Sequence, residues 1–188
     1  MVWFIFRIDY VAKRYSVVLR TNELQCGDHI AYPMEWSSSW PELVTENALL
    51  QRVLPYHHAI VLAVMGGSKV KVIHVLPTQK TPDGSLIYEV VEQQIDVGDD
   101  IENRNLWRYE YEPGQCYDPD EVIVRAKKEI GHFKYDFIFN NCEHFARGCK
   151  TDKKVSVQVR RAEAVLIIAG GVVLGVIAVV AGVYLARR

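Results

Sequence analysis

The chain has 188 residues, 49% of them apolar, with 22 Lys and Arg against 23 Asp and Glu. A net charge of -1, with no basic stripe interleaved with aromatic residues, excludes a chain built to bind nucleic acid. The four cysteines form no CxxC pair and no zinc spacing, so we expect free thiols in a reducing compartment, no metal and no cofactor.

The first part of the chain predicts a strand and a loop, and leaves residues 4–20 open between two structures. Residues 4–20 are rich in β-branched and aromatic residues, which suits either a strand or an amphipathic contact with lipid. Residues 28–32 predict a strand that Pro33 ends. Residues 36–41 form a loop with two tryptophans. We expect these to pack on the domain, and contact with a membrane interface is the alternative.

A β-hairpin is predicted next, because apolar-rich residues 59–64 and 69–75 flank Gly66-Gly67-Ser68. His57 enters the first strand and His74 ends the second, so pairing brings both to the same end of the hairpin. His57 and His58 are adjacent, and in a strand their side chains point to opposite faces. At most one of them can therefore meet a thiol packed on the sheet.

The second half of the chain predicts more strands and two helices. A turn-rich connection at 78–84 precedes strands at 86–94 and 106–111, with Gly98-Asp99-Asp100 between them. Asp118 and Pro119 begin a helix that Gly131 ends. Its apolar stripe comprises Val122, Ile123, Ala126 and Ile130. Aromatic-rich residues 133–139 lead into a last helix, so the predicted fold class is α+β, with an antiparallel sheet against that helix.

Cys142 is the candidate nucleophile, because Asn141 is a good N-cap and places it in the first turn of the last helix. Unpaired N–H groups and the helix dipole stabilise a thiolate there, so we expect a thiol pKa below its ordinary value of about 8.5. The same N–H groups can stabilise an acyl-transfer oxyanion. The pattern indicates a cysteine acyl-transfer enzyme whose base comes from elsewhere in the chain. Glu143 would stabilise the helix start, and His144 would pack or hydrogen-bond behind the site.

Several segments resemble the lecithin:retinol acyltransferase (LRAT)-like proteins, a family that includes the H-Rev-type phospholipase/acyltransferases. The matching segments are Gly27-Asp28-His29-Ile30, Tyr56-His57-His58-Ala59-Ile60-Val61, Val72-Ile73-His74-Val75-Leu76-Pro77 and Asn141-Cys142-Glu143-His144-Phe145. The resemblance covers roughly residues 26–150 and implies a permuted papain-like (NlpC-type) fold. It implies Cys142 as the nucleophile, His57 as general base and acid, and His74 as the residue that orients His57. The family usually has an aromatic residue at position 58, and we expect His58 at the surface or an edge.

Residues 164–186 form an uncharged apolar stretch of about 34 Å as a helix, enough for a hydrocarbon core of about 30 Å. We expect a single-pass C-terminal anchor in an intracellular membrane, preceded by a basic juxtamembrane linker at 151–163. The excess of Lys and Arg before the span places the domain in the cytosol. A buried core helix is the alternative. Gly171 and Gly175 form a GxxxG pattern that suits a weak homodimer through the tail helix.

The predicted function is a membrane-anchored thiol phospholipase A1/A2 and acyltransferase acting on glycerophospholipids in membranes. An acyl group would pass through a Cys142 thioester to water, to the amine of phosphatidylethanolamine or to a lysophospholipid. The alternatives are a permuted papain-like isopeptidase or peptidase, and a non-catalytic membrane adaptor. The role of residues 1–25, the acyl acceptor, the preferred acyl position, the organelle and the use of retinol stay open.

Overall fold

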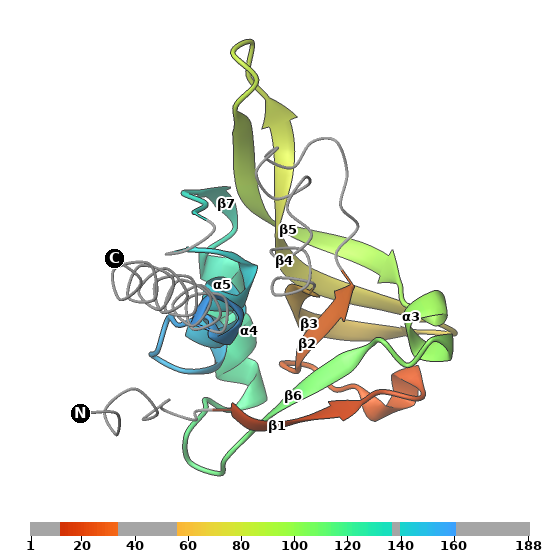
Figure 1. Ribbon diagram of the computed structural model, residues 1–188. Coiled ribbons are helices and arrows are strands. Elements are labelled where there is room, and N and C mark those ends of the chain that lie inside the picture. Colours follow the sequence, from red (N-terminus) through yellow and green to blue (C-terminus); the bar gives the residue numbers. More distant parts are fainter. Residues whose placement is uncertain (1–11, 34–55, 137–139, 161–188) are drawn as a thin grey trace, which may run out of the picture.

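The computed structural model describes residues 12–33, 56–136 and 140–160 (Figure 1). The described strands form one antiparallel sheet in the order β1-β6-β2-β3-β4-β5-β7. They are β1 (Ala12–Val17), β2 (His29–Pro33), β3 (Tyr56–Gly66), β4 (Lys69–Lys80), β5 (Leu86–Asp96), β6 (Trp107–Tyr111) and β7 (Gly131–Phe133). The labelled helical elements are η1 (Thr21–Glu23), α3 (Gly98–Glu102), α4 (Pro119–Lys128) and α5 (Cys142–Lys150), and residues 157–160 are also helical.

The two longer described helices, α4 and α5, lie together on one face of the sheet (Figure 1). A buried apolar cluster joins them to the strands and includes Ile60, Ile73, Val90, Val122, Ala126 and Phe145. A second cluster lies on the other face and includes Ile30, Ala59, Val61, Val72 and Leu106. The predicted α+β class with an antiparallel sheet is confirmed, and the permuted papain-like chain order stays a prediction from the resemblance.

The predicted hairpin is confirmed in β3 and β4, which turn at Gly66 and Gly67 with φ of 93° and 59°. Glycine adopts such positive φ angles without the steric cost of a Cβ atom. The prediction that His74 ends the second strand is wrong, because β4 runs on to Lys80. It continues because β5 pairs with it along its whole length, a long-range partner that local sequence does not reveal.

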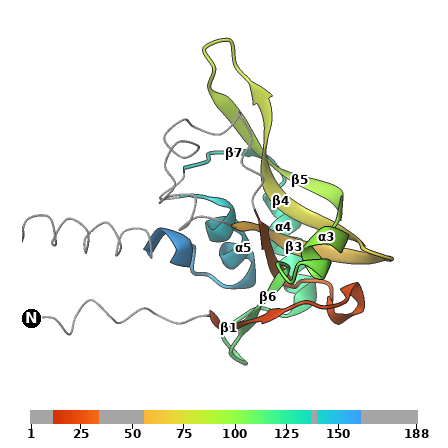
Figure 2. The same cartoon turned by 45° about the vertical axis from the view of Figure 1, so that its right-hand side comes forward.

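The strands β3 and β4 separate beyond the pair Ala59↔His74, where their registered pairing ends. From that point β4 pairs with β5 alone, and the β4–β5 hairpin projects beyond the rest of the sheet (Figures 1 and 2). The N-terminal end of β3 therefore has β2 on one side and no registered β4 partner on the other.

The side chains of alternate residues of β3 lie on opposite faces of the sheet. Ile60 belongs to the helix-facing cluster, and Ala59 belongs to the cluster on the other face. His58 therefore lies on the helix-facing side, and His57 lies on the other side, as alternation predicts. The N–H of Val61 donates to the carbonyl of Asp28, beside β2 (2.8 Å). By the same alternation, the N–H of His58 points away from β2, toward the gap that β4 leaves.

Other predicted elements are mostly confirmed, with local differences. Residues 12–17 are a strand, which settles that part of the open segment 4–20. Gly98-Asp99-Asp100 begins the short helix α3. Helix α4 begins as predicted, but Gly131, with φ of 118°, begins β7 and does not end the helix. Ile130 is 47% exposed and not part of the apolar stripe, because the helix has already ended.

Some predictions fall outside the described residues. These are the tryptophan loop at 36–41, the apolar stretch at 164–186, and the GxxxG pattern within it. Within the described ranges, no helix is both long and apolar enough to span a bilayer.

Candidate active site

Cys142 is the first residue of α5, and Asn141 caps that helix as predicted. The Asn141 side-chain oxygen accepts hydrogen bonds from the N–H groups of Glu143 (3.0 Å) and His144 (3.1 Å). His144 completes a capping box, because its Nδ1 accepts from the N–H of Asn141 (3.2 Å). The prediction that His144 hydrogen-bonds behind the site is therefore confirmed. This double cap fixes the first turn and with it the position of the thiol.

The thiol of Cys142 lies where β3 and β4 separate. The backbone N–H groups of His58, of Glu143 and of Cys142 itself lie close enough to the thiol to lower its pKa. In a continuous sheet the N–H of His58 would point to β4, but registered pairing has already ended at Ala59. The N–H of His58 therefore has no registered strand partner on the β4 side.

The thiol of Cys142 affects the pKa values of tyrosines on both faces of the sheet. A Cys142 thiolate contributes to raising the pKa of Tyr32, which lies on the His57 face, and of Tyr88 and Tyr135, which belong to the helix-facing side. Burial is the largest cause of all three shifts. The charge of a Cys142 thiolate would therefore act on tyrosines on both faces of the sheet.

Burial outweighs the N–H groups in setting the acidity of Cys142. The residue is 3% exposed, and its burial raises the pKa of the thiol to about 12, with the Glu143 carboxylate adding to the increase. The prediction of a lowered thiol pKa is therefore wrong for this structure. The helix N-terminus is present as expected, but removing a thiolate from water costs more than the helix N-terminus recovers.

His57 and His74 form a hydrogen-bonded pair on the face opposite α5. Nε2 of His57 lies 3.1 Å from Nδ1 of His74, and Nε2 of His74 lies 3.0 Å from Oε1 of Gln93 on β5. The hydroxyl of Tyr32 also lies 3.2 Å from Nδ1 of His74. The structure therefore brings the two sequence-predicted histidines together, and adds Gln93 and Tyr32, which sequence reasoning missed.

The direction of these hydrogen bonds defines the protonation of His57. With Oε1 of Gln93 as acceptor, His74 carries its proton on Nε2 and accepts at Nδ1. The partner nitrogen of His57 is then Nε2–H, which leaves Nδ1 of His57 with its lone pair. Nδ1 is thus the nitrogen that can accept a proton.

Both imidazoles are neutral at pH 7. Burial lowers the pKa of His57 well below its usual range, and the nearby His74 and His58 lower it further. Burial likewise lowers the pKa of His74 to about 4, although its bond to Gln93 opposes the change. The resting site therefore combines a neutral thiol with neutral imidazoles. Among the described residues, the thiol makes no hydrogen bond to an imidazole.

His58 is fully buried on the α5 side, so the prediction of a surface or edge position is wrong. Its Nδ1 lies 2.8 Å from Nε2 of His29, and its Nε2 lies 2.7 Å from Nε2 of Gln158. Both ring nitrogens are used in this way, so His58 cannot also accept the proton of the thiol. His57 is the better candidate base on this ground, in agreement with the resemblance.

Glu143 lies beneath the first turn of α5 as a fully buried carboxylate. It accepts from Nε of Arg147 (2.9 Å), from the hydroxyl of Ser156 (2.7 Å) and from the N–H of Gln158 (3.0 Å). Its pKa falls to about 2, because nearby His58, the positive charge of Arg147 and these hydrogen bonds outweigh the cost of burial. Glu143 therefore stabilises the helix start through a buried network, and not through the cap.

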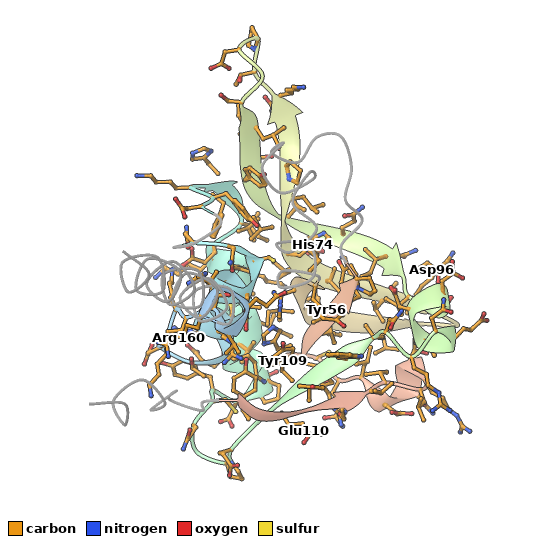
Figure 3. All side chains as sticks on the ribbon, viewed as in Figure 1. Tyr56, His74, Asp96, Tyr109, Glu110 and Arg160 are labelled. Atoms are coloured by element: carbon orange, nitrogen blue, oxygen red, sulfur yellow. The ribbon has the colours of Figure 1, made fainter. Side chains whose placement is uncertain are left out.

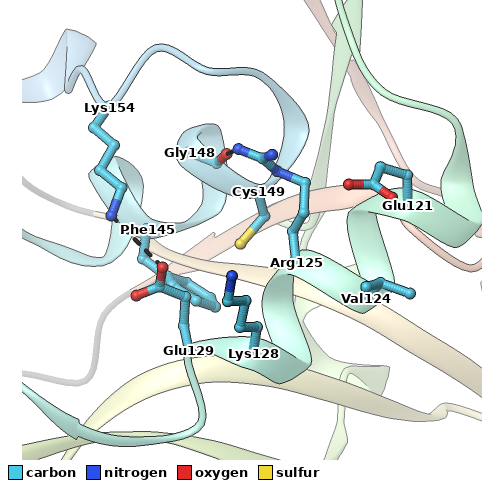
Figure 4. A pocket seen from close by; sticks show the side chains of 9 residues that line it. All are labelled: Glu121, Val124, Arg125, Lys128, Glu129, Phe145, Gly148, Cys149 and Lys154. Atoms are coloured by element: carbon cyan, nitrogen blue, oxygen red, sulfur yellow. Dashed lines mark hydrogen bonds and ion pairs between the residues drawn. The ribbon is translucent and has the colours of Figure 1, made fainter.

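The cavity between α4 and α5 is separate from this site. It measures about 310 Å³, and Figure 4 shows Cys149, Arg125 and Lys128 directed into it. Its lining contains neither Cys142 nor a histidine. Burial raises the pKa of the Cys149 thiol to about 12, so that thiol is held neutral. Within the described part of the chain, no cluster of His, Cys, Asp and Glu could hold a metal ion.

The fold and the site define an α+β protein with a buried thiol at a helix N-terminus and a histidine pair on the adjoining sheet. A family model described as lecithin retinol acyltransferase matches residues 46–155, more than half of the chain. The chain belongs to this family, whose activity is generally of acyltransferase or phospholipase type. Comparison with curated proteins gave no match, and comparison with solved structures gave none.

Proposed function

We propose that this protein is a thiol phospholipase and acyltransferase that takes a fatty acyl group from a glycerophospholipid as a Cys142 thioester. Family membership supports the reaction class. The place of Cys142 at the start of α5, next to the backbone N–H of His58 on the strand that also carries His57, supports the assignment of the nucleophile. Such N–H groups can hold the oxyanion that forms when an ester carbonyl is attacked.

In the first half of the reaction, the Cys142 sulfur bonds to the ester carbonyl carbon and its proton passes to Nδ1 of His57. The N–H groups of His58 and Glu143 hydrogen-bond to the oxyanion of the tetrahedral intermediate. Collapse of that intermediate breaks the ester C–O bond. His57 then returns the proton to the departing lysophospholipid oxygen, which leaves a thioester on Cys142.

In the second half, water, an amine or a hydroxyl attacks the thioester carbon and gives its proton to Nδ1 of His57. The C–S bond breaks, and the proton moves from His57 to the sulfur, which restores the neutral thiol. The products are a free fatty acid or an acylated acceptor. His74 holds His57 throughout by accepting its Nε2–H, and Gln93 fixes the tautomer of His74.

The proton transfer accompanies the attack in this mechanism, because the resting thiol and imidazole are both neutral. A thiol pKa of about 12 and a His57 pKa well below 6.5 disfavour a resting thiolate–imidazolium pair. Hydrogen bonds between nucleophile and base are often long without substrate and tighten in the reacting complex. His57 therefore acts as a general base toward the thiol.

The proposal includes attachment to a membrane, which rests on the sequence. The apolar stretch 164–186 would anchor the protein in an intracellular membrane, and the basic residues in 151–163 would keep the domain on the cytosolic side. Anchoring would hold the domain beside its lipid substrate and raise the effective substrate concentration. A weak homodimer through Gly171 and Gly175 is part of the same proposal.

The test is intact mass spectrometry of the full chain in mixed micelles with phosphatidylcholine, quenched in acid. We expect an acyl-sized mass increase on Cys142 that is absent in Cys142→Ala and strongly reduced in His57→Ala. Cys149→Ala is the matched control, because it removes another buried thiol of the same helix and should keep the adduct.

An acyl adduct or fatty acid release that persists in Cys142→Ala would refute the mechanism. A folded wild-type protein that forms no adduct and releases no fatty acid would also overturn the proposal. In that case cleavage of a protein conjugate would identify an isopeptidase, and inactivity on both substrates would support the adaptor function.

A further inference from the structure

Residues 156–160, which we call the strap, follow the end of the region that matches the family and pack against both β3 and α5. Arg160, the last residue of the strap, is labelled in Figure 3. Ser156 and Gln158 are almost fully buried there, although both are polar. The strap residues at 157–160 are helical, and the hydroxyl oxygen of Ser156 accepts from the N–H of Val159 (3.1 Å) at the start of that turn. A buried polar side chain is costly unless it is hydrogen-bonded, so the partners of these two residues are informative.

The Gln158 side chain is held by the backbone of Tyr56, the first residue of β3. Its Oε1 accepts from the N–H of Tyr56 (3.3 Å), and its Nε2 donates to the carbonyl of Tyr56 (3.2 Å). Because the Tyr56 N–H can only donate and its carbonyl can only accept, this pair of bonds fixes which end of the amide is which. The nitrogen end of Gln158 therefore faces His58.

The fixed amide determines the tautomers of two buried histidines in succession. Nε2 of Gln158 donates to Nε2 of His58 (2.7 Å), so His58 carries its proton on Nδ1. That proton is donated to Nε2 of His29 (2.8 Å), so His29 also carries its proton on Nδ1 and donates to the hydroxyl of Tyr111 (2.6 Å). The hydrogen bonds from the strap through β3 and β2 toward Tyr111 on β6 therefore all have the same donor-to-acceptor direction.

Both histidines in this chain of hydrogen bonds are neutral. Burial lowers the pKa of His58 to about 4, with Arg147 lowering it and the Glu143 carboxylate opposing the change. Burial lowers the pKa of His29 well below its usual range, and His58, Arg147 and Lys150 lower it further. Neither ring therefore carries a second proton at pH 7.

The strap contacts the two elements that present N–H groups to the thiol. Through Tyr56 and His58 it holds the end of β3, and the N–H of His58 faces Cys142. Through the Gln158 N–H and the Ser156 hydroxyl it holds the carboxylate of Glu143, whose own N–H also faces Cys142. The same two strap residues therefore fix β3 and the first turn of α5 relative to each other.

We propose that Ser156 and Gln158 are positioning residues that set the convergence of the His58 and Glu143 N–H groups on the Cys142 sulfur, with Gln158 imposing the Nδ1–H tautomer on His58 and His29. The effect on catalysis rests on the proposed function, but the tautomers do not. Neither residue touches the reacting atoms. They act through the backbone of β3 and through Glu143.

The first experiment is ¹⁵N nuclear magnetic resonance of the full chain in micelles, labelled at histidine, at pH 7. We expect both His58 and His29 to show the Nδ1–H tautomer, which is the opposite of the tautomer that a free histidine side chain favours. Gln158→Glu replaces the donor with an acceptor, so the proton of His58 should move to Nε2 or a second proton should bind. An Nε2–H tautomer at His58 in the wild type, or an unchanged tautomer in Gln158→Glu, would overturn the inference.

The second experiment measures phospholipid cleavage by Gln158→Leu and Ser156→Ala. We expect kcat to fall about tenfold to a hundredfold, with KM within about twofold, because misplacing reacting groups by about 1 Å costs on that order. Gln94→Leu is the matched control, since Gln94 is exposed on β5. Should Gln158→Leu fail to fold, Ser156→Ala and the wild-type spectrum still decide the question.

The two experiments separate two kinds of failure. A wild-type enzyme that is inactive on phospholipid but shows both Nδ1–H tautomers would refute the proposed function and leave the hydrogen-bond assignment intact. An active wild type with folded strap variants that keep full kcat would refute the positioning role and leave the proposed function intact.

Discussion

The backbone N–H of His58 lies close enough to the sulfur of Cys142 to lower the pKa of the thiol, although the side chain of His58 is hydrogen-bonded in a different network on the helix-facing side. The main chain of His58 therefore lies beside the candidate nucleophile, while the side chain of its neighbour His57 is the candidate base. This arrangement depends on the early separation of β3 from β4, which leaves that N–H without its registered strand partner.

The Cys142 thiol should react slowly with a small neutral alkylating agent at pH 7.5. Its pKa of about 12 leaves almost no thiolate, and the residue is buried, whereas Cys26 is exposed. We expect iodoacetamide to label Cys26 first, with Cys142 and Cys149 following much later, as measured by peptide mass spectrometry. Labelling of Cys142 before Cys26 would show that the resting site holds a thiolate.

Gln93 should matter for activity through the tautomer of His74. In Gln93→Leu, His74 can carry its proton on Nδ1, which would then oppose the Nε2–H of His57. We expect kcat/KM for phospholipid to fall about tenfold and His74→Ala to cost about a hundredfold, the range of general acid–base contributions. Exposed Gln94→Leu serves as control, and equal activity of Gln93→Leu and Gln94→Leu would contradict the assignment.

Stability should fall as the pH is lowered from about 7 to about 4. Burial holds the pKa of His58 and of His74 near 4, below the usual 6.5. Between these pH values the two histidines are protonated in the unfolded chain and neutral in the folded chain. The loss is complete near pH 4 and is on the order of 3 kcal/mol for each histidine. Urea unfolding at several pH values measures it. His74→Asn should flatten the slope, and a wild-type stability independent of pH over this range would contradict the prediction.

Glu143→Gln should be strongly destabilising, because it leaves the guanidinium of Arg147 buried beside a neutral amide. Arg147 is 2% exposed, and breaking a buried ion pair costs about 3–5 kcal/mol. The pair of partly exposed Arg108 and exposed Glu110, 4.0 Å apart, provides the control: Glu110→Gln should cost less than about 1 kcal/mol. Urea unfolding at pH 7 compares the two. A similar cost for both variants would show that the buried network does not hold the helix.

Local sequence signals predicted the elements that depend on neighbouring residues. Gly66 and Gly67 indicated the turn between β3 and β4, and Asn141 indicated the start of α5 at Cys142. The pairing of His57 with His74 followed from that turn. These predictions needed only strand alternation, turn geometry and helix capping, all of which act over a few residues.

The properties that sequence missed depend on partners far along the chain. His58 is buried because His29 and Gln158 satisfy its two nitrogens, and they lie 29 and 100 residues away. The acidity of Cys142 was predicted from the helix start alone, whereas burial by packed strands dominates it. Gln93 lies among exposed polar residues of β5, and nothing in its neighbourhood in sequence distinguishes it from Gln94.

Because residues 57 and 58 are both histidine, a slip of β3 by one position would still leave an imidazole at one of the two positions, while Tyr56 or Ala59 would occupy the other. The same slip would move Ala59, Ile60 and Val61 to the faces opposite the apolar clusters in which they now lie. The correct alignment of this site therefore also depends on three aliphatic side chains that take no part in its chemistry.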